Sequence, residues 1–202
     1  MNIGIEFDKT LIHYDPLLHQ LACARELIPE STPVTIQAVK AALLKQDLEA
    51  DWLELQSEVL GEDILLVKPY AGAVDFFRMA HEQSITLTII SEKPRHPPKN
   101  SDCDLHVAVH KWLDHYGFTS PEDINLSPEM VFLELSDTDK LQRIAALGCD
   151  FFIDNDFSFL DMPGFPMSVR RILFDPIGET EASPDFKTVS SWLQLQKMLL
   201  RS

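Results

Sequence analysis

Acidic and hydroxyl side chains stand at the ends of several short apolar runs, and four of them are Glu6, Asp8, Ser91 and Asp154. Apolar and acidic residues alternate over residues 3–8, so a strand with period two would place Glu6 and Asp8 on the same side. Clustered carboxylates repel each other and persist together mainly where a cation neutralises them. Because hard oxygen ligands favour Mg²⁺, which also binds phosphate, the pattern predicts a magnesium-type phosphate site.

Basic side chains accompany these acids. Lys140 opens a predicted helix, where its charge opposes the helix dipole, and this position mildly favours a functional role over a structural one. Lys93 and Arg95 follow Ser91 in a loop, where they are either phosphate-facing cations or solvated surface charges. Ser91 or Asp154 taken alone would more often be a helix cap or a turn residue, so the order of these residues along the chain carries the argument.

The elements that must position these residues alternate between strand and helix after residue 70. Apolar runs predict strands at about 3–8, 85–90, 130–135, 150–153 and 170–174. Amphipathic or capped segments predict helices at about 15–28, 31–45, 47–60, 73–82, 104–116, 138–147 and 187–200. This alternation predicts an α/β, Rossmann-like fold with a mostly parallel sheet and helices on both of its faces.

One block interrupts the alternation. Residues 14–65 hold three predicted helices without a strand, directly after the first strand. We therefore predict an α/β core formed by residues 1–13 and 66–202, with residues 14–65 as a small helical cap inserted after strand one. Ligands of open α/β sheets bind at the carboxyl ends of the strands, so this insert is expected to act as a lid over that edge.

The order of the motifs resembles that of the haloacid dehalogenase superfamily, mostly phosphatases that form an aspartyl-phosphate intermediate. The first motif of that family, hydrophobic-Asp-x-Asp-x-Thr, is matched by Ile-Glu-Phe-Asp-Lys-Thr at residues 5–10. The second, a Ser or Thr that ends an apolar strand, is matched at 88–91, the third by Lys140, and the fourth, an acidic pair, at 152–155. Residues 91–97 read Ser-x-Lys-x-Arg-x-Pro, a loop that small bacterial members of the family carry.

The resemblance implies catalytic roles for four residues. Glu6 occupies the position of the nucleophile, and Asp8 that of the general acid and base. Ser91 would donate a hydrogen bond to the phosphoryl oxygen, and Lys140 would neutralise its charge. Positioning and electrostatics of this kind supply most of the catalysis in phosphoryl transfer.

The resemblance also implies a binding role for a second set of residues. The Mg²⁺ ligands would be Glu6, the Asp8 carbonyl, Asp154 and Asn155. A small phosphorylated molecule would be the substrate, in contact with residues that the motifs place near the phosphate: Thr10, Lys93 and Arg95.

Two positions depart from the family pattern. Glu6 replaces an aspartate, and its extra methylene displaces the carboxylate by more than an ångström, which can cost about 10²-fold in rate. Asn155 replaces the second acid of the fourth motif, a loss for which Asp156 or Asp161 would have to compensate. Both departures indicate a weakened or repurposed site.

Three functions compete on this basis. The leading one is a Mg²⁺-dependent phosphatase, and the second is a scaffold of the same fold that has lost its chemistry and binds a ligand or a partner. The third is a dehalogenase, which the intact Asp8 disfavours because displacement of halide does not need that acid and base.

Composition excludes several other classes of protein. The chain has 202 residues and a formal net charge of −15, which disfavours duplex nucleic acid and anionic membranes as partners. Three cysteines without CxxC spacing (Cys23, Cys103 and Cys149) fit neither a disulfide framework nor a zinc site. With no apolar run of membrane-spanning length and no signal-peptide pattern, the chain is expected to be cytoplasmic.

Overall fold

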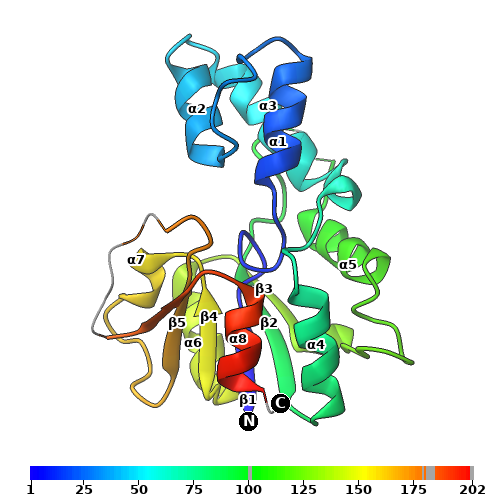
Figure 1. The fold of residues 1–202 in the computed structure, drawn as a ribbon, viewed down its shortest axis with the longest axis vertical. Helices are drawn as coiled ribbons and strands as arrows, with labels where there is room; N and C mark the ends of the chain where they lie inside the picture. The colour runs from blue at the N-terminus through cyan, green and yellow to red at the C-terminus, as the bar shows by residue number, and fades with distance from the viewer. Residues whose placement is uncertain (100–101, 179, 181–184, 201–202) are drawn as a thin grey trace. The chain divides into compact units, whose positions relative to one another are not determined.

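The structure is a computed structural model of the whole chain, and it describes residues 1–99, 102–178, 180 and 185–200. The chain forms two compact units (Figure 1). The first unit carries the sheet and consists of Met1–Ile12, Pro69–Lys93 and Leu113–Ser202. The second unit is helical and consists of His13–Lys68 and Pro94–Trp112.

The first unit is built on six strands in the order β3-β2-β1-β4-β5-β6, and all five pairings are parallel. The strands are β1 (Asn2–Ile5), β2 (Thr86–Glu92), β3 (Val131–Glu134), β4 (Phe151–Asp154), β5 (Arg170–Phe174) and β6 (Lys187–Val189). The predicted α/β fold with a parallel sheet is confirmed. All six strands therefore present their carboxyl ends at one edge of the sheet.

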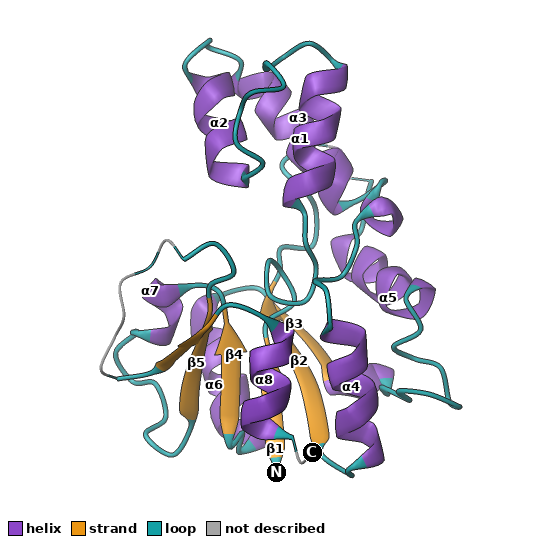
Figure 2. Ribbon diagram, in the orientation of Figure 1, coloured by secondary structure: helices purple, strands orange, loops and turns teal. Residues whose placement is uncertain are grey.

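Helices cover both faces of this sheet (Figure 2). They are α4 (Ala73–Glu82), α6 (Asp137–Leu147), α7 (Phe157–Leu160) and α8 (Trp192–Leu199), and a 3₁₀ turn, η2 (Pro128–Met130), precedes β3. On one face, aromatic side chains of α4, α8 and β5 pack together, with Trp192 5.1 Å from Phe76 and 5.9 Å from Phe174 between ring centroids. On the other face, Phe152 and Ile144 join β4 to α6 in a second apolar cluster. Alternate strand residues thus feed two cores, as period two requires.

The second unit begins with three helices directly after the first strand and its loop, as predicted. They are α1 (Asp15–Ala24), α2 (Ile36–Leu44) and α3 (Glu49–Leu60), followed by a 3₁₀ turn, η1 (Ile64–Leu66). The three helices pack on one another through buried aliphatic side chains: Leu18, Ala22, Val39, Leu43 and Leu55. Helix α2 starts five residues later than the sequence indicated, because the side chain of Thr35 caps it by accepting from the Ala38 amide.

Residues 94–112 belong to the helical unit, whereas the sequence placed them with the α/β core. They include most of α5 (Leu105–His115). The Trp112 indole donates to the Val67 carbonyl at 2.7 Å, and the Lys99 amide donates to the Ser57 hydroxyl at 2.9 Å. Contacts between segments this far apart in the chain cannot be predicted from local hydrophobic periodicity.

The C-terminal region also differs from the prediction. The single closing helix expected over 187–200 is a three-residue strand, β6, followed by α8. The four-residue helix α7 was not predicted either. Strand β6 and helix α7 are each shorter than the span over which a hydrophobic period can be recognised. Among the described residues, no helix combines the length and the apolar character needed to cross a bilayer.

Candidate active site at the carboxyl edge of the sheet

Three neighbouring strands bring three candidate residues to one edge. Glu6 directly follows β1, Ser91 lies near the end of β2, and Asp154 is the last residue of β4. Because β1 pairs with both β2 and β4, Ser91 and Asp154 flank Glu6 on either side. The Glu6 amide donates to the Ile153 carbonyl at 2.9 Å, so the pairing with β4 continues as far as this residue.

The Glu6 side chain folds back over its own loop and is only 4% exposed. Its Oε1 accepts hydrogen bonds from the amides of Phe7, at 2.8 Å, and Asp8, at 2.9 Å. The buried Ser91 hydroxyl donates to the same oxygen. One carboxylate oxygen therefore receives three donors, and the extra methylene of glutamate is accommodated by this folded-back conformation.

Lys140 lies between two carboxylates. Its Nζ is 2.5 Å from Glu6 Oε2 and 2.7 Å from Asp154 Oδ2, and it lies 3.8 Å from the centroid of the Phe159 ring. Burial lowers the pKa of this lysine, but the charges of Glu6 and Asp154 outweigh burial and raise that pKa above its ordinary value. The ammonium is therefore a fixed positive charge at the bottom of the site.

Asp154 is fully enclosed, at 1% exposure. Its second oxygen, Oδ1, accepts from the Asp156 amide at 2.8 Å. Burial raises the pKa of Asp154 to about 7, with the negative charge of Glu6 acting in the same direction and Lys140 opposing both. The Lys140 ammonium therefore neutralises part of the negative charge that Glu6 and Asp154 bring into the buried site.

Lys93 and Asp8 form a second ion pair. Lys93 Nζ lies 2.7 and 2.8 Å from the two oxygens of the Asp8 carboxylate, which is itself 30% exposed. The lysine is 1% exposed and its ammonium stands 5.6 Å from the centroid of the Phe7 ring. It is thus neither a solvated charge nor a distant loop cation, and it fixes the orientation of Asp8. No local pattern indicates a contact between residues that are 85 positions apart.

Thr10 and Asn155 meet beside these pairs, since the Thr10 hydroxyl donates to Asn155 Oδ1 at 3.3 Å. The Trp192 indole holds the same loop by donating to the Thr10 carbonyl at 3.0 Å. Asp156 caps α7 by accepting from two of its first amides. Asp161 is exposed at the other end of α7. Asp156 therefore contacts Asp154 through its backbone amide, while its carboxylate accepts from amides of α7.

Arg95 and Glu92 lie close to Ser91 and Lys93 along the chain and differ in their surroundings. Arg95 lies in the helical unit, where it pairs with Asp104 at 2.8 Å. Glu92, which ends β2, is half-buried, and burial together with Asp137 and Glu6 raises its pKa. Sequence reasoning passed over Glu92, although its position directly after Ser91 at a strand end was a usable signal.

The donor set fits a hard divalent cation that keeps most of its waters. The carboxylates of Glu6 and Asp154 lie close together, since both contact the Lys140 ammonium, and the Asp8 carbonyl belongs to the loop that follows Glu6. No cluster of three or more acidic, histidine or cysteine side chains able to hold a metal occurs in the described part of the chain. Mg²⁺ commonly uses only one or two carboxylates together with substrate phosphate, so two side chains suffice.

Comparison with known proteins gives the class of fold. The sequence matches no protein-family model and no curated relative. A haloacid dehalogenase (HAD) family hydrolase from Deinococcus radiodurans R1, solved with bound phosphate and sodium, has a TM-score of 0.58 at 12% identity, over 98% of this chain and 94% of that one. A HAD phosphatase from Thermococcus onnurineus has a TM-score of 0.54 at 14% identity, over 98% and 97% of the two chains.

A dehalogenase solved as an intermediate complex is also similar, with a TM-score of 0.60 at 13% identity over 100% of this chain and 97% of that one. The protein therefore has the haloacid dehalogenase-like fold: a parallel α/β sheet with a helical insert after its first strand. At these identities the similarity concerns the fold alone.

Proposed function

We propose that this protein is a Mg²⁺-dependent phosphatase that acts on a small phosphorylated molecule, with Glu6 in the place of the nucleophile. One observation carries the proposal: a buried ammonium, Lys140, lies between the carboxylates of Glu6 and Asp154 at the carboxyl edge of a parallel sheet. A fixed cation beside a carboxylate is the arrangement that stabilises an incoming phosphoryl group. Bound phosphate in the structurally similar Deinococcus hydrolase supports the same class of ligand.

In the proposed reaction, Glu6 Oε2 attacks phosphorus, the bond from phosphorus to the leaving oxygen breaks, and an acyl phosphate forms on Glu6. Oε2 is the attacking atom because Oε1 is held by Ser91 and by two backbone amides. Lys140 then transfers its contact from Oε2 to the phosphoryl oxygens. Water subsequently cleaves the acyl phosphate, which releases phosphate and restores the Glu6 carboxylate.

Asp8 moves the protons in both steps, giving one to the leaving oxygen and later taking one from the attacking water. Its two oxygens contact Lys93, so this lysine holds the carboxylate in one orientation. Thr10 and Asn155 support the same loop from the other side. Arg95, in the helical unit, is proposed as a candidate for substrate binding and not for chemistry.

Glu6, Asp154 and the Asp8 carbonyl are the groups proposed to hold Mg²⁺. When bound, the ion supplies charge neutralisation for the transferring phosphoryl group. Asn155 lies next to Asp154 and offers an amide oxygen, which already accepts from Thr10.

A second function, a binding scaffold without catalytic activity, is favoured by the contacts that occupy both carboxylate oxygens of Glu6. Oε1 of Glu6 has three donors, and Oε2 has the buried Lys140 2.5 Å away. A nucleophile whose oxygens are all engaged must give up an ion pair before it can attack, and this raises the barrier. In a scaffold, the same contacts would serve only to hold the edge of the sheet in shape.

The rate of a Glu6→Asp variant separates the two functions. With a generic aryl phosphate and Mg²⁺, we expect kcat to rise by about one to two orders of magnitude, equivalent to about 1.4–2.8 kcal/mol of barrier. The shorter acid frees the carboxylate from its folded-back conformation. Asp8→Asn, which keeps the shape of the loop, serves as the inactive control.

Each outcome has a distinct meaning. A wild type that is active, with a weaker Glu6→Asp variant, would mean that the site has adapted to glutamate, and the phosphatase proposal would stand. Rates of wild type and Glu6→Asp that both equal the rate of Asp8→Asn would reject the phosphatase and leave the scaffold.

A further inference from the structure

A cleft of about 720 Å³ lies at the other edge of the sheet, formed by the amino ends of β4, β5 and β6, the loop before β5 and the end of α8. Phe151, Arg170 and Lys187 are the first residues of their strands, whereas Glu6 and Asp154 lie at the carboxyl ends. The three steps from Phe151 to Asp154 span about 10 Å along β4. The cleft is therefore separate from the candidate active site.

The strand register explains why the cleft has two chemically different ends. Phe151 pairs with Arg170, and Lys187 pairs with Ile172, two residues further along β5. Period two then places Phe151, Arg170 and Lys187 on one face of the sheet, which is the face covered by α8. Arg171 points to the opposite face, so the cleft passes around the amino edge from one face to the other.

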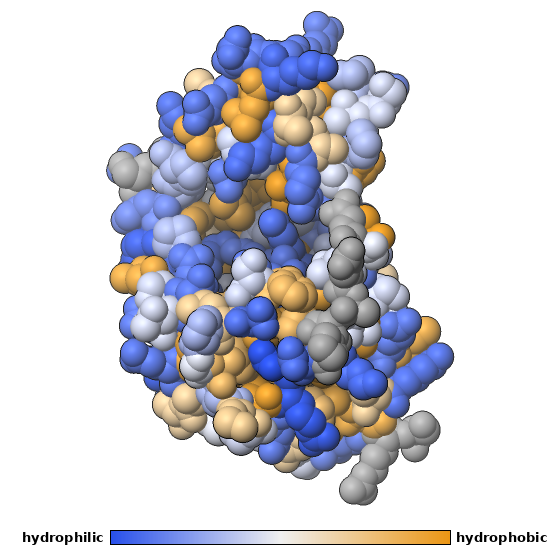
Figure 3. Space-filling model, turned by 90° about the vertical axis from the view of Figure 1, so that its left-hand side faces the viewer, coloured by the Kyte–Doolittle hydropathy of each residue, from blue (hydrophilic) through white to orange (hydrophobic). Residues whose placement is uncertain are grey.

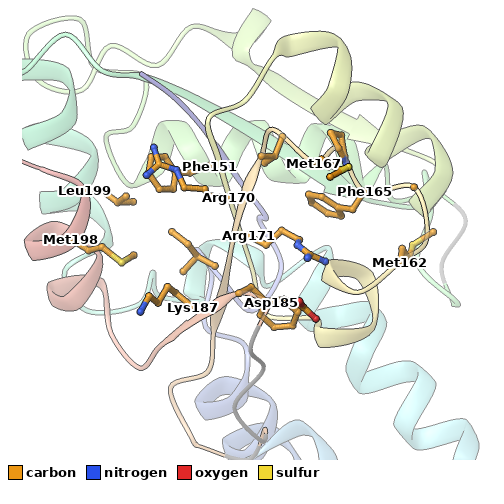
Figure 4. Close-up of a pocket in the computed structure, with 15 residues that line it drawn as sticks. Phe151, Met162, Phe165, Met167, Arg170, Arg171, Asp185, Lys187, Met198 and Leu199 are labelled. Carbon is orange, nitrogen blue, oxygen red and sulfur yellow. The ribbon is translucent and has the colours of Figure 1, made fainter.

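Figure 4 shows this division. Arg170 and Lys187 lie toward α8, beside Leu199 and Met198, and the opposite end is formed by three apolar side chains of the loop before β5: Met162, Phe165 and Met167. Arg171 and Asp185 lie between the two ends. The cleft thus has a cationic end and an apolar end.

Part of the lining is held in place by contacts within the protein. The Arg171 guanidinium donates to the Leu160 carbonyl at 2.7 Å and lies 5.6 and 5.4 Å from the ring centroids of Phe165 and Phe186. Arg170 stacks 4.0 Å over Phe151 and remains exposed to solvent. These contacts position the walls of the cleft before any ligand arrives, which lowers the entropic cost of binding.

The charge of the cleft opposes that of the chain. Three of its lining residues are cationic (Arg170, Arg171 and Lys187) and one, Asp185, is acidic, in a protein whose formal net charge is −15. Hydrophilic and hydrophobic surface alternate on this side of the α/β unit (Figure 3), and Met167 is fully exposed. A local excess of cations beside exposed apolar side chains on an acidic protein selects ligands that are both anionic and apolar.

We propose that this cleft binds a small anionic amphiphile, such as a medium-chain carboxylate, with its head group at Arg170 and Lys187 and its hydrocarbon body along Met162, Phe165 and Met167. The volume lies within the range of about 300–1,000 Å³ usual for small-molecule sites. Flexible methionine side chains adapt to unbranched chains of different length.

The experiment is a calorimetric titration of the full chain with dodecanoate, kept below its micellar concentration. We expect one site, and about tenfold weaker binding to an Arg170→Glu/Lys187→Glu variant, because both exposed cations then repel the head group. The matched control is Lys45→Glu/Lys68→Glu, which makes the same change of net charge at two exposed lysines of the helical unit and is expected to bind like the wild type. Dodecyltrimethylammonium, with the same chain and the opposite charge, is expected not to bind.

The methyl signals of the six methionines report where the ligand binds, independently of how tightly it binds. In ¹³C-methyl methionine spectra, dodecanoate is expected to shift the three methionines that line the cleft, Met162, Met167 and Met198, and to leave the other three in place, Met1, Met79 and Met130. Equal binding to both charge variants, equal binding of the cationic amphiphile, or shifts spread over all six methionines would overturn the proposal. If dodecanoate does not bind and an acidic, phenylalanine-containing peptide does, the proposal is overturned and the cleft is assigned to a protein partner.

Discussion

Replacing Lys140 by methionine removes the cation on which the candidate active site is built while preserving side-chain volume. The change leaves Glu6 and Asp154, at 4% and 1% exposure, without the ammonium that lies 2.5 and 2.7 Å from their oxygens. Breaking a buried ion pair by deleting one partner costs about 3–5 kcal/mol. For a chain of this size, that loss corresponds to a fall in Tm of about 6–20 °C.

The matched control is Lys93→Met, which deletes another lysine that is almost fully buried. Its partner, Asp8, is 30% exposed and can be hydrated once the lysine is gone. We therefore expect a loss of at most about 1 kcal/mol, or about 4 °C, from this variant. Thermal unfolding followed by circular dichroism, with all three proteins in one buffer, measures the difference.

The loss in Lys140→Met should also depend on pH. Lys140 lowers the pKa of Asp154, so without it that pKa rises above the value of about 7 in the wild type. Above about pH 7 the wild-type carboxyl has lost its proton, whereas the carboxyl of the variant keeps its proton to higher pH. The stability lost in Lys140→Met relative to the wild type therefore grows as the pH rises above 7, by up to about 1.4 kcal/mol per pH unit. Equal losses in the Lys140→Met and Lys93→Met variants, or a Lys140→Met loss relative to the wild type that is no larger at about pH 8 than at about pH 6, would refute the role assigned to Lys140.

Two further predictions concern the neighbouring acids and the buried thiol. Asp154→Ala should abolish the heat of Mg²⁺ binding in calorimetry. Asp156→Ala should keep that heat and lose about 1 kcal/mol of folding stability, because Asp156 caps α7. Loss of Mg²⁺ binding in Asp156→Ala but not in Asp154→Ala would contradict the proposed ligands. Burial raises the pKa of Cys149 to about 11, so in mass spectra taken after treatment with iodoacetamide at pH 8 the folded protein should be unmodified at this residue. Alkylation of Cys149 as fast as in the unfolded chain would contradict its burial.

Local sequence patterns were sufficient for the class of fold and for most of its elements. Strand β5 and helix α4 were predicted with their observed bounds, because each combines a clear period with a definite end. The helical insert after β1 followed from the absence of a strand over residues 14–65. Parallel strands present their carboxyl ends at one edge, so this topology alone brought Glu6, Ser91 and Asp154 together.

Local sequence patterns did not predict the elements and contacts that depend on residues far apart in the chain. The three-residue strand β6 exists because β5 offers it a partner, and the segment 94–112 packs with the helical unit through contacts such as that of Trp112 with Val67. Neither association has a signature within a window of neighbouring residues.

The chemical state of the site was also decided by tertiary structure. The sequence grouped Glu6, Asp8 and Lys140 in one candidate site and left Lys93 either facing the phosphate or at the surface, and the pairing of these charges was open. Folding enclosed each lysine with particular carboxylates, Lys140 with Glu6 and Asp154, and Lys93 with Asp8. A buried charge must be neutralised by a neighbour because water is excluded, and which neighbour does so depends on three-dimensional distance and not on separation along the chain.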